Sequence, residues 1–98
     1  MDNMLTHKAV RDLTKHTLAN ALPKIEIGKI DVRDYTDASG EDALEITIIL
    51  SKGKVVGLNG RDLMKVLGEI QTALSKQGDD RFPYLRYLTA HEAKQLAS

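Results

Sequence analysis

The stretch ALEITIIL, at residues 43–50, decides the fold of this chain. Its aliphatic residues occupy every second position from 44 to 50, and Glu45 and Thr47 stand between them. Successive side chains of a strand point to opposite faces of a sheet, so this alternation is typical of a strand with one buried face. The stretch therefore predicts the clearest strand of the chain.

A second strand is predicted upstream, over residues 24–35. The isoleucines before Gly28 alternate in one phase, whereas Ile30 and Val32 alternate in the opposite phase. A slip of one residue turns every later side chain to the other face of a sheet, so we expect a β-bulge at Gly28. The polar segment at 37–42 is typical of a turn. The two strands are therefore predicted to form an antiparallel hairpin.

A helix is predicted before the hairpin, over residues 5–22. This segment holds no Gly, and it stops before Pro23, which disfavours helical geometry in the preceding residue. Its apolar residues lie on two sides of the helix, and both sides must be buried. In so small a domain, we expect a partner to cover the side that holds Met4, Leu18 and Leu22.

Three more elements are predicted after the hairpin. Residues 61–77 form the most secure helix, because their apolar side chains fall within an arc of about 120°. Asn59 is a suitable N-cap for this helix, and Gly78 supplies its C-terminal stop. A short strand follows over residues 84–88. A last helix is predicted over residues 90–97, with a capping box formed by Thr89 and Glu92.

The whole chain, residues 1–98, is predicted to be one α+β domain with the element order α-β-β-α-β-α. We expect a three-stranded, mostly antiparallel sheet with the helices packed on one face. The first strand is long enough to pair on both sides, which favours the strand order 2-1-3.

The composition fits one ordinary folded domain. The chain has 98 residues, of which 42% are hydrophobic and 29% charged, and its formal net charge is zero. It holds no cysteine, which excludes a disulfide scaffold and thiol nucleophiles. No apolar stretch approaches the ~20 residues of a membrane span, and no signal peptide is visible. The cytoplasm is the expected compartment.

A basic, glycine-rich segment offers a nucleic-acid hypothesis. GLNG, at residues 57–60, resembles the GXXG loop of KH domains, which clamps a nucleic-acid backbone. In that family the tetrapeptide links two helices, but residues 51–56 are too short to form the first of them. A loop that lets the chain turn from strand to helix is the simpler interpretation. The candidate contacts of an anion or nucleic acid are Lys52, Lys54, Gly60, Arg61 and Lys65.

The charge balance argues against a dedicated nucleic-acid binder, which usually has a strong basic excess. Residues 25–50 hold seven carboxylates and two cations, whereas residues 51–78 hold five cations and two carboxylates. The acidic hairpin is most simply interpreted as a solvated turn, and a docking surface for a basic partner is the functional alternative.

Three of the four aromatic residues stand within residues 82–87. In a strand, Tyr84 and Arg86 point to one side and Tyr87 to the other. Aromatic residues beside arginine are enriched in interface hot spots. We expect Phe82 to lie in the core and Arg81 to pair with Asp80 on the surface. The candidate protein interface consists of Met4, Leu18, Leu22, Tyr84, Arg86 and Tyr87.

No catalytic constellation can be named. His7 and His16 lie nine residues apart on one helix, about 180° around its axis, so they cannot share a metal. The serines lack a nucleophile elbow or a neighbouring base. We therefore expect a protein that is no enzyme and that needs no cofactor and no metal.

Residues 40–44 (GEDAL) and 81–87 (RFPYLRY) resemble segments of small uncharacterised bacterial cytosolic proteins. That resemblance implies no activity. The leading hypothesis is a small interaction or regulatory module that contacts a protein partner and forms a homodimer. Nucleic-acid binding is the alternative, and an enzyme of unknown class is the third hypothesis.

Overall fold

The computed structural model of the chain describes residues 4–51 and 58–97. Its element order, α-β-β-α-β-α, confirms the α+β class predicted from the sequence. The elements are α1 (His7–Ala21), β1 (Ile27–Thr36), β2 (Asp42–Leu50), α2 (Gly60–Lys76), β3 (Phe82–Thr89) and α3 (Ala90–Ala97).

The sheet is mixed, and β2 is its central strand. β1 pairs with β2 in the antiparallel direction, and β3 pairs with the other side of β2 in the parallel direction. The expected order 2-1-3 is therefore wrong. The helix α2 carries the chain back to the end of the sheet where β2 begins, and a β-α-β crossover of this kind places two parallel strands side by side. β1 and β3 become the two edges.

The hairpin has the bulge and the turn that its sequence indicates. The register of β1 against β2 shifts between Ile27 and Lys29, at Gly28. In the turn, the Asp37 carboxylate accepts hydrogen bonds from the Ser39 amide at 2.9 Å and the Glu41 amide at 3.0 Å. Gly40 has a φ of 85°, which favours glycine over any residue with a side chain. Local contacts therefore set the register of the hairpin.

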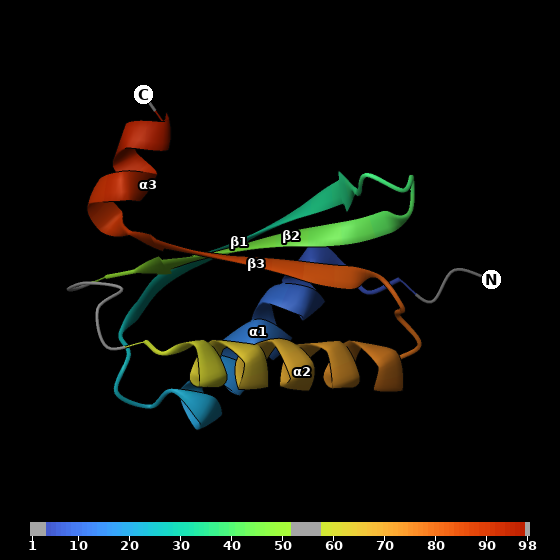
Figure 1. Cartoon of the computed structure of the whole chain (residues 1–98), viewed down its shortest axis with the longest axis horizontal. Helices are drawn as coiled ribbons and strands as arrows, with labels where there is room; N and C mark the ends of the chain where they lie inside the picture. Colours follow the sequence, from blue (N-terminus) through green and yellow to red (C-terminus); the bar gives the residue numbers. More distant parts are fainter. Residues whose placement is uncertain (1–3, 52–57, 98) are drawn as a thin grey trace.

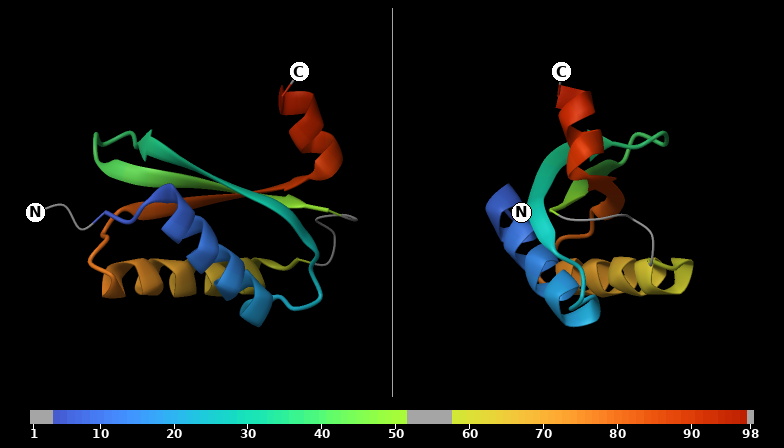
Figure 2. Two further views of the ribbon diagram at one scale, coloured as in Figure 1. Left: turned by 180° about the vertical axis from the view of Figure 1, so that it is seen from behind. Right: turned by 90° about the vertical axis from the view of Figure 1, so that its left-hand side faces the viewer.

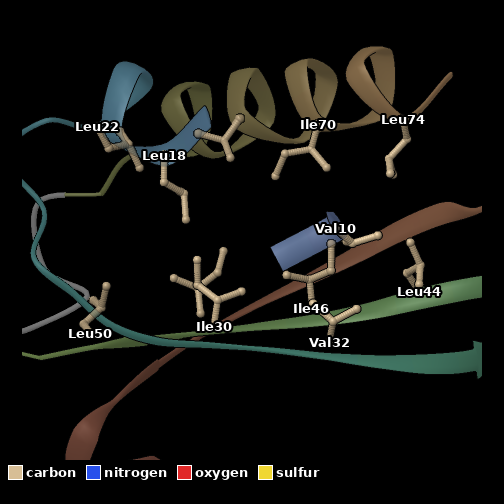
Figure 3. Close-up of a cluster of buried hydrophobic side chains, with 12 residues drawn as sticks. Val10, Leu18, Leu22, Ile30, Val32, Leu44, Ile46, Leu50, Ile70 and Leu74 are labelled. Carbon is tan, nitrogen blue, oxygen red and sulfur yellow. The ribbon is translucent and has the colours of Figure 1, made fainter. Parts of the chain in front are cut away.

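The helices α1 and α2 cover one face of the sheet (Figures 1 and 2). The core lies between them and the strands, and Figure 3 shows aliphatic side chains from α1, α2 and β2 pointing toward one another. Leu18 and Leu22 belong to this core, with exposed fractions of 1% and 9%. The expectation that a partner covers them is wrong, because α1 packs against both β1 and α2 of its own chain.

The helix α1 begins later than predicted. Thr6 is its N-cap, and the Thr6 hydroxyl accepts a hydrogen bond from the Ala9 amide at 3.1 Å. Met4 therefore precedes the helix, and its side chain is exposed.

The helix α3 stands on the other side of the sheet from α1 and α2 (Figures 1 and 2). Thr89 and Glu92 form the predicted capping box, with reciprocal hydrogen bonds of 3.0 and 3.1 Å. Because β3 ends at Thr89 and α3 starts at Ala90, no loop carries the helix back to the covered face. The expectation that all helices share one face thus holds for the two long helices, and α3 departs from it.

Candidate interaction surface

The face of the sheet turned away from α1 and α2 is here called the open face. Ile30 and Val32 of β1 and Ile46 and Ile48 of β2 are buried on the covered face. The residues between them therefore point to the open face, and the pairing register extends this assignment to β3. The open face consists of Lys29, Asp31, Arg33, Tyr35, Ala43, Glu45, Thr47, Ile49, Phe82, Tyr84, Arg86 and Leu88.

Three aromatic rings meet on the open face, at the end of the sheet where the hairpin turns. The centroids of Tyr35 and Tyr84 lie 5.4 Å apart in an edge-to-face arrangement, and those of Phe82 and Tyr84 lie 4.8 Å apart. We call these three residues the aromatic cluster. Their exposed fractions are 42% for Tyr35, 36% for Phe82 and 40% for Tyr84. Phe82 is therefore a surface residue, contrary to the prediction that it lies in the core.

The acidic turn and Tyr84 influence each other's pKa. A hydrogen bond from the Ser39 hydroxyl, with smaller ones from the Glu41 amide and the Tyr84 phenol, keeps the pKa of Asp37 below its usual value. Desolvation, followed by the charge of Asp37, raises the pKa of Tyr84. The Asp37 carboxylate therefore lies close enough to the Tyr84 phenol for the two groups to interact electrostatically. This contact joins the aromatic cluster to the acidic turn.

The charges of the open face are arranged by sign. Asp37 and Glu41 lie in the turn, whereas Glu45 stands opposite Arg33 in the register of β1 and β2. In the middle of the face, Arg33 donates to Asp31 at 3.1 Å, so these two charges offset each other. The opposite end of the face carries Lys29 and Arg86, together with Lys94 of α3. Asp37 and Glu41 thus make the turn end acidic, and Lys29 and Lys94 make the α3 end basic, while the rows between them carry both signs.

A groove of about 420 Å³ lies between α3 and the open face. Ile49 and Leu88 of the sheet and Leu96 of α3 contribute its apolar lining, and Leu96 is 63% exposed. Lys29, Arg86 and Lys94 line the same hollow, as do Asp31 and Arg33, which pair with each other. We call it the α3 groove. An apolar lining with three ammonium or guanidinium groups suits a ligand that combines apolar surface with carboxylates.

The six residues of the predicted protein interface do not form one surface. Tyr84 and Arg86 lie on the open face, as their alternation in the strand indicates. Tyr87 points to the covered face and packs against the core. Burial raises the pKa of Tyr87 to about 12. Met4 lines a different hollow of about 290 Å³, which it shares with Tyr35.

The predicted nucleic-acid contacts are only partly described. Lys52 and Lys54 lie outside the described residues. Gly60, Arg61 and Lys65 are exposed at the start of α2, on the far side of the sheet from the open face. The predicted N-cap is confirmed, because the Asn59 side chain accepts a hydrogen bond from the Asp62 amide at 2.9 Å.

A buried ion pair, which the sequence does not reveal, fixes the segment before α1. The Arg81 Nη2 atom donates to Asp79 at 2.7 Å and to the Leu5 carbonyl at 2.9 Å, and the Leu5 amide donates to Asp79 at 3.0 Å. Arg81 therefore pairs with the buried Asp79 and not, as expected, with Asp80 on the surface. No local pattern marks Asp79 as buried, because Leu5 is 74 residues away in the sequence.

The imidazole of His7 pairs with the Asp34 carboxylate at 2.8 Å, and Arg81 Nη1 donates to the same oxygen at 3.3 Å. The hydrogen bond with His7 lowers the pKa of Asp34. Because both side chains of the His7–Asp34 pair are largely exposed, the contact links the start of α1 to β1 at the surface.

Within residues 4–51 and 58–97, no three His, Cys, Asp or Glu residues are grouped so that they could hold a metal ion. Nor is any helix of that part of the chain long and apolar enough to cross a bilayer. No family model, no curated protein and no solved structure matches this chain.

Proposed function

We propose that this protein is a non-enzymatic interaction module that self-associates through the open face of its sheet. The aromatic cluster carries the proposal. Three large rings expose between 36% and 42% of their surface on one face, side by side. Aromatic residues are enriched at the centres of protein interfaces because they bury a large area at a small entropic cost.

The charges beside the cluster favour a protein partner over a nucleic acid. Single-strand binders combine stacking rings with a positively charged groove that follows the phosphates. Here Asp37 contacts Tyr84, and Glu45 stands opposite Tyr84 in the register of the sheet. The Asp37 carboxylate repels phosphate at the place where a base would stack, whereas the charge of Glu45 is offset by Arg33, its partner across β1 and β2. A protein surface of mixed charge meets no such penalty.

The dimensions of the face indicate a weak complex. Three strands about 4.8 Å apart and eight residues of about 3.3 Å each give a face of roughly 14 Å by 26 Å, or about 370 Å². A standard interface buries about 800 Å² on each partner. The exposed side of α3 adds to this area, but the total stays well below that of a standard interface. We therefore expect a dissociation constant in the micromolar range.

Sedimentation velocity from about 1 µM to about 1 mM protein tests this proposal. The weight-average mass should rise from that of one chain toward that of two. Tyr84→Ser should abolish the rise, since it removes the central ring of the cluster. Met64→Ser is the matched control, because Met64 is 66% exposed on α2, away from the open face. A mass that stays at one chain up to about 1 mM would overturn the proposal.

Nucleic-acid binding remains the second candidate, and one observation favours it. Arg61 and Lys65 are both exposed and lie one turn apart at the start of α2, so they share a side of that helix. Titration of labelled single-stranded RNA at low and moderate salt tests this candidate. If the protein binds nucleic acid at this site, the affinity should fall as the salt concentration rises, and Arg61→Ala should reduce it further. We propose the cytoplasm as the compartment for either function, because a chain without cysteine needs no oxidising environment to form disulfides.

A further inference from the structure

The two ends of the open face complement each other. The turn end presents the aromatic cluster together with the carboxylates of Asp37 and Glu41, and both of these residues belong to the turn that closes the hairpin. The α3 end presents the α3 groove, whose apolar lining includes Leu88 and Leu96 and whose cations include Lys94. Rings suit the apolar lining, and carboxylates suit the cations. Each copy of the chain therefore carries a surface and its counterpart.

Two copies can stack their open faces about a two-fold axis in two simple ways. If the axis runs along the strands, each end meets the same end of the partner, so Lys94 approaches the Lys94 of the partner subunit and carboxylates approach carboxylates. If the axis runs across the strands, the direction of the strands reverses between the copies. The turn end of each copy then faces the α3 end of the other, and opposite charges meet. Electrostatic complementarity selects the second arrangement.

We infer that the partner bound by the open face is a second copy in this reversed orientation, with the acidic turn of each copy in the α3 groove of the other. The inference rests on the proposed function and specifies its partner and geometry. The contact is isologous, so each dimer contains the turn–groove contact twice and leaves no open end for further copies. The helix α3 serves in this dimer as the wall that receives the turn of the partner.

Charge reversal tests the arrangement. Glu41→Lys and Lys94→Glu each place like charges in both turn–groove contacts, and each should weaken the dimer on the order of tenfold at low salt. The variant that carries both changes should recover to within about threefold of the natural chain, because the two contacts become attractive again. An equimolar mixture of the two single variants should recover as well, through a heterodimer in which both contacts pair opposite charges.

Lys15→Glu is the matched control, because Lys15 is exposed on α1, on the covered side of the sheet, and its reversal changes the net charge by the same amount. It should leave the dimer unchanged. A dimer that Tyr84→Ser disrupts but that the double variant does not restore would overturn the reversed orientation and leave the proposed function standing. A chain that never dimerises would overturn both.

Discussion

The two faces of the sheet are built by the same three strands, yet they differ in almost every property. The covered face is aliphatic, and its side chains from β1 and β2 are nearly inaccessible to water below α1 and α2. The open face carries the three rings of the aromatic cluster, five charged side chains, and the aliphatic side chains of Ala43, Ile49 and Leu88. The comparison shows that the covered face suffices for the core, while the open face exposes apolar surface that the core does not use.

Two consecutive isoleucines of β2 give the largest expected contrast between the faces. Ile48 is fully buried on the covered face, whereas Ile49 lies half-buried on the open face. Ile48→Ala should lower the free energy of unfolding by about 4 kcal/mol, since it leaves a cavity in the core. Ile49→Ala should lower it by about 1 kcal/mol. Urea denaturation at about 1 µM, where the monomer dominates, measures both, and equal losses would contradict the assignment of the faces.

The next largest effect on stability is expected at the buried ion pair of Asp79 and Arg81. Asp79→Ala leaves Arg81 buried without its main partner and should cost about 3 kcal/mol at pH 7. The exposed neighbour Asp80 supplies the control, and Asp80→Ala should cost less than about 0.5 kcal/mol. If both variants lose the same stability, the pair does not hold the segment before α1 to β3.

The stability that the Asp79–Arg81 pair contributes should depend on pH. Burial raises the pKa of Asp79, but the hydrogen bonds from Arg81 and from the Leu5 amide outweigh it, so the net pKa is lowered from 3.8. A carboxyl with a lowered pKa in the folded state stabilises the protein above the pKa of the unfolded state. That contribution is lost as the pH falls through the native pKa. The difference between the natural chain and Asp79→Ala should therefore be full at pH 7 and shrink below about pH 4.

The smallest contrast compares two tyrosines of β3 on opposite faces. The Tyr87 hydroxyl is buried on the covered face and has no hydrogen-bond partner among the described residues. Tyr87→Phe should raise the free energy of unfolding by about 1 kcal/mol, because it removes an unsatisfied polar group. Tyr84→Phe removes an exposed hydroxyl on the open face and should leave the free energy of unfolding nearly unchanged. Thermal unfolding at low protein concentration measures both variants, and a loss of stability in Tyr87→Phe would show that the Tyr87 hydroxyl is satisfied.

Much of the local structure could be read from the residues. The bulge at Gly28, the turn at residues 37–42 and the helix caps at Asn59 and Thr89 all appear where the sequence places them. In each of these features the interacting groups are close in the chain, so residue type and spacing are sufficient. The same holds for the side of β3 that carries Tyr84 and Arg86.

The candidate surface was only partly visible in the sequence, for a related reason. Tyr84 and Arg86 were identified because alternation within one strand places them together. Tyr35, which completes the aromatic cluster, comes from the opposite edge strand and meets Tyr84 only across the sheet. The groove beside α3 depends on the side to which that helix turns, and no local pattern indicates it.

The sequence by itself determined the six elements, their order, the caps at Asn59 and Thr89, and the side of β3 that carries Tyr84 and Arg86. The tertiary structure decided the rest: that β2 is central, that α1 has both apolar sides covered by its own chain, and that Arg81 joins Asp79 to Leu5. The physical reason is range. Periodicity and caps act over a few residues, whereas strand order, helix burial and the Arg81 contacts depend on which distant surfaces exclude water together.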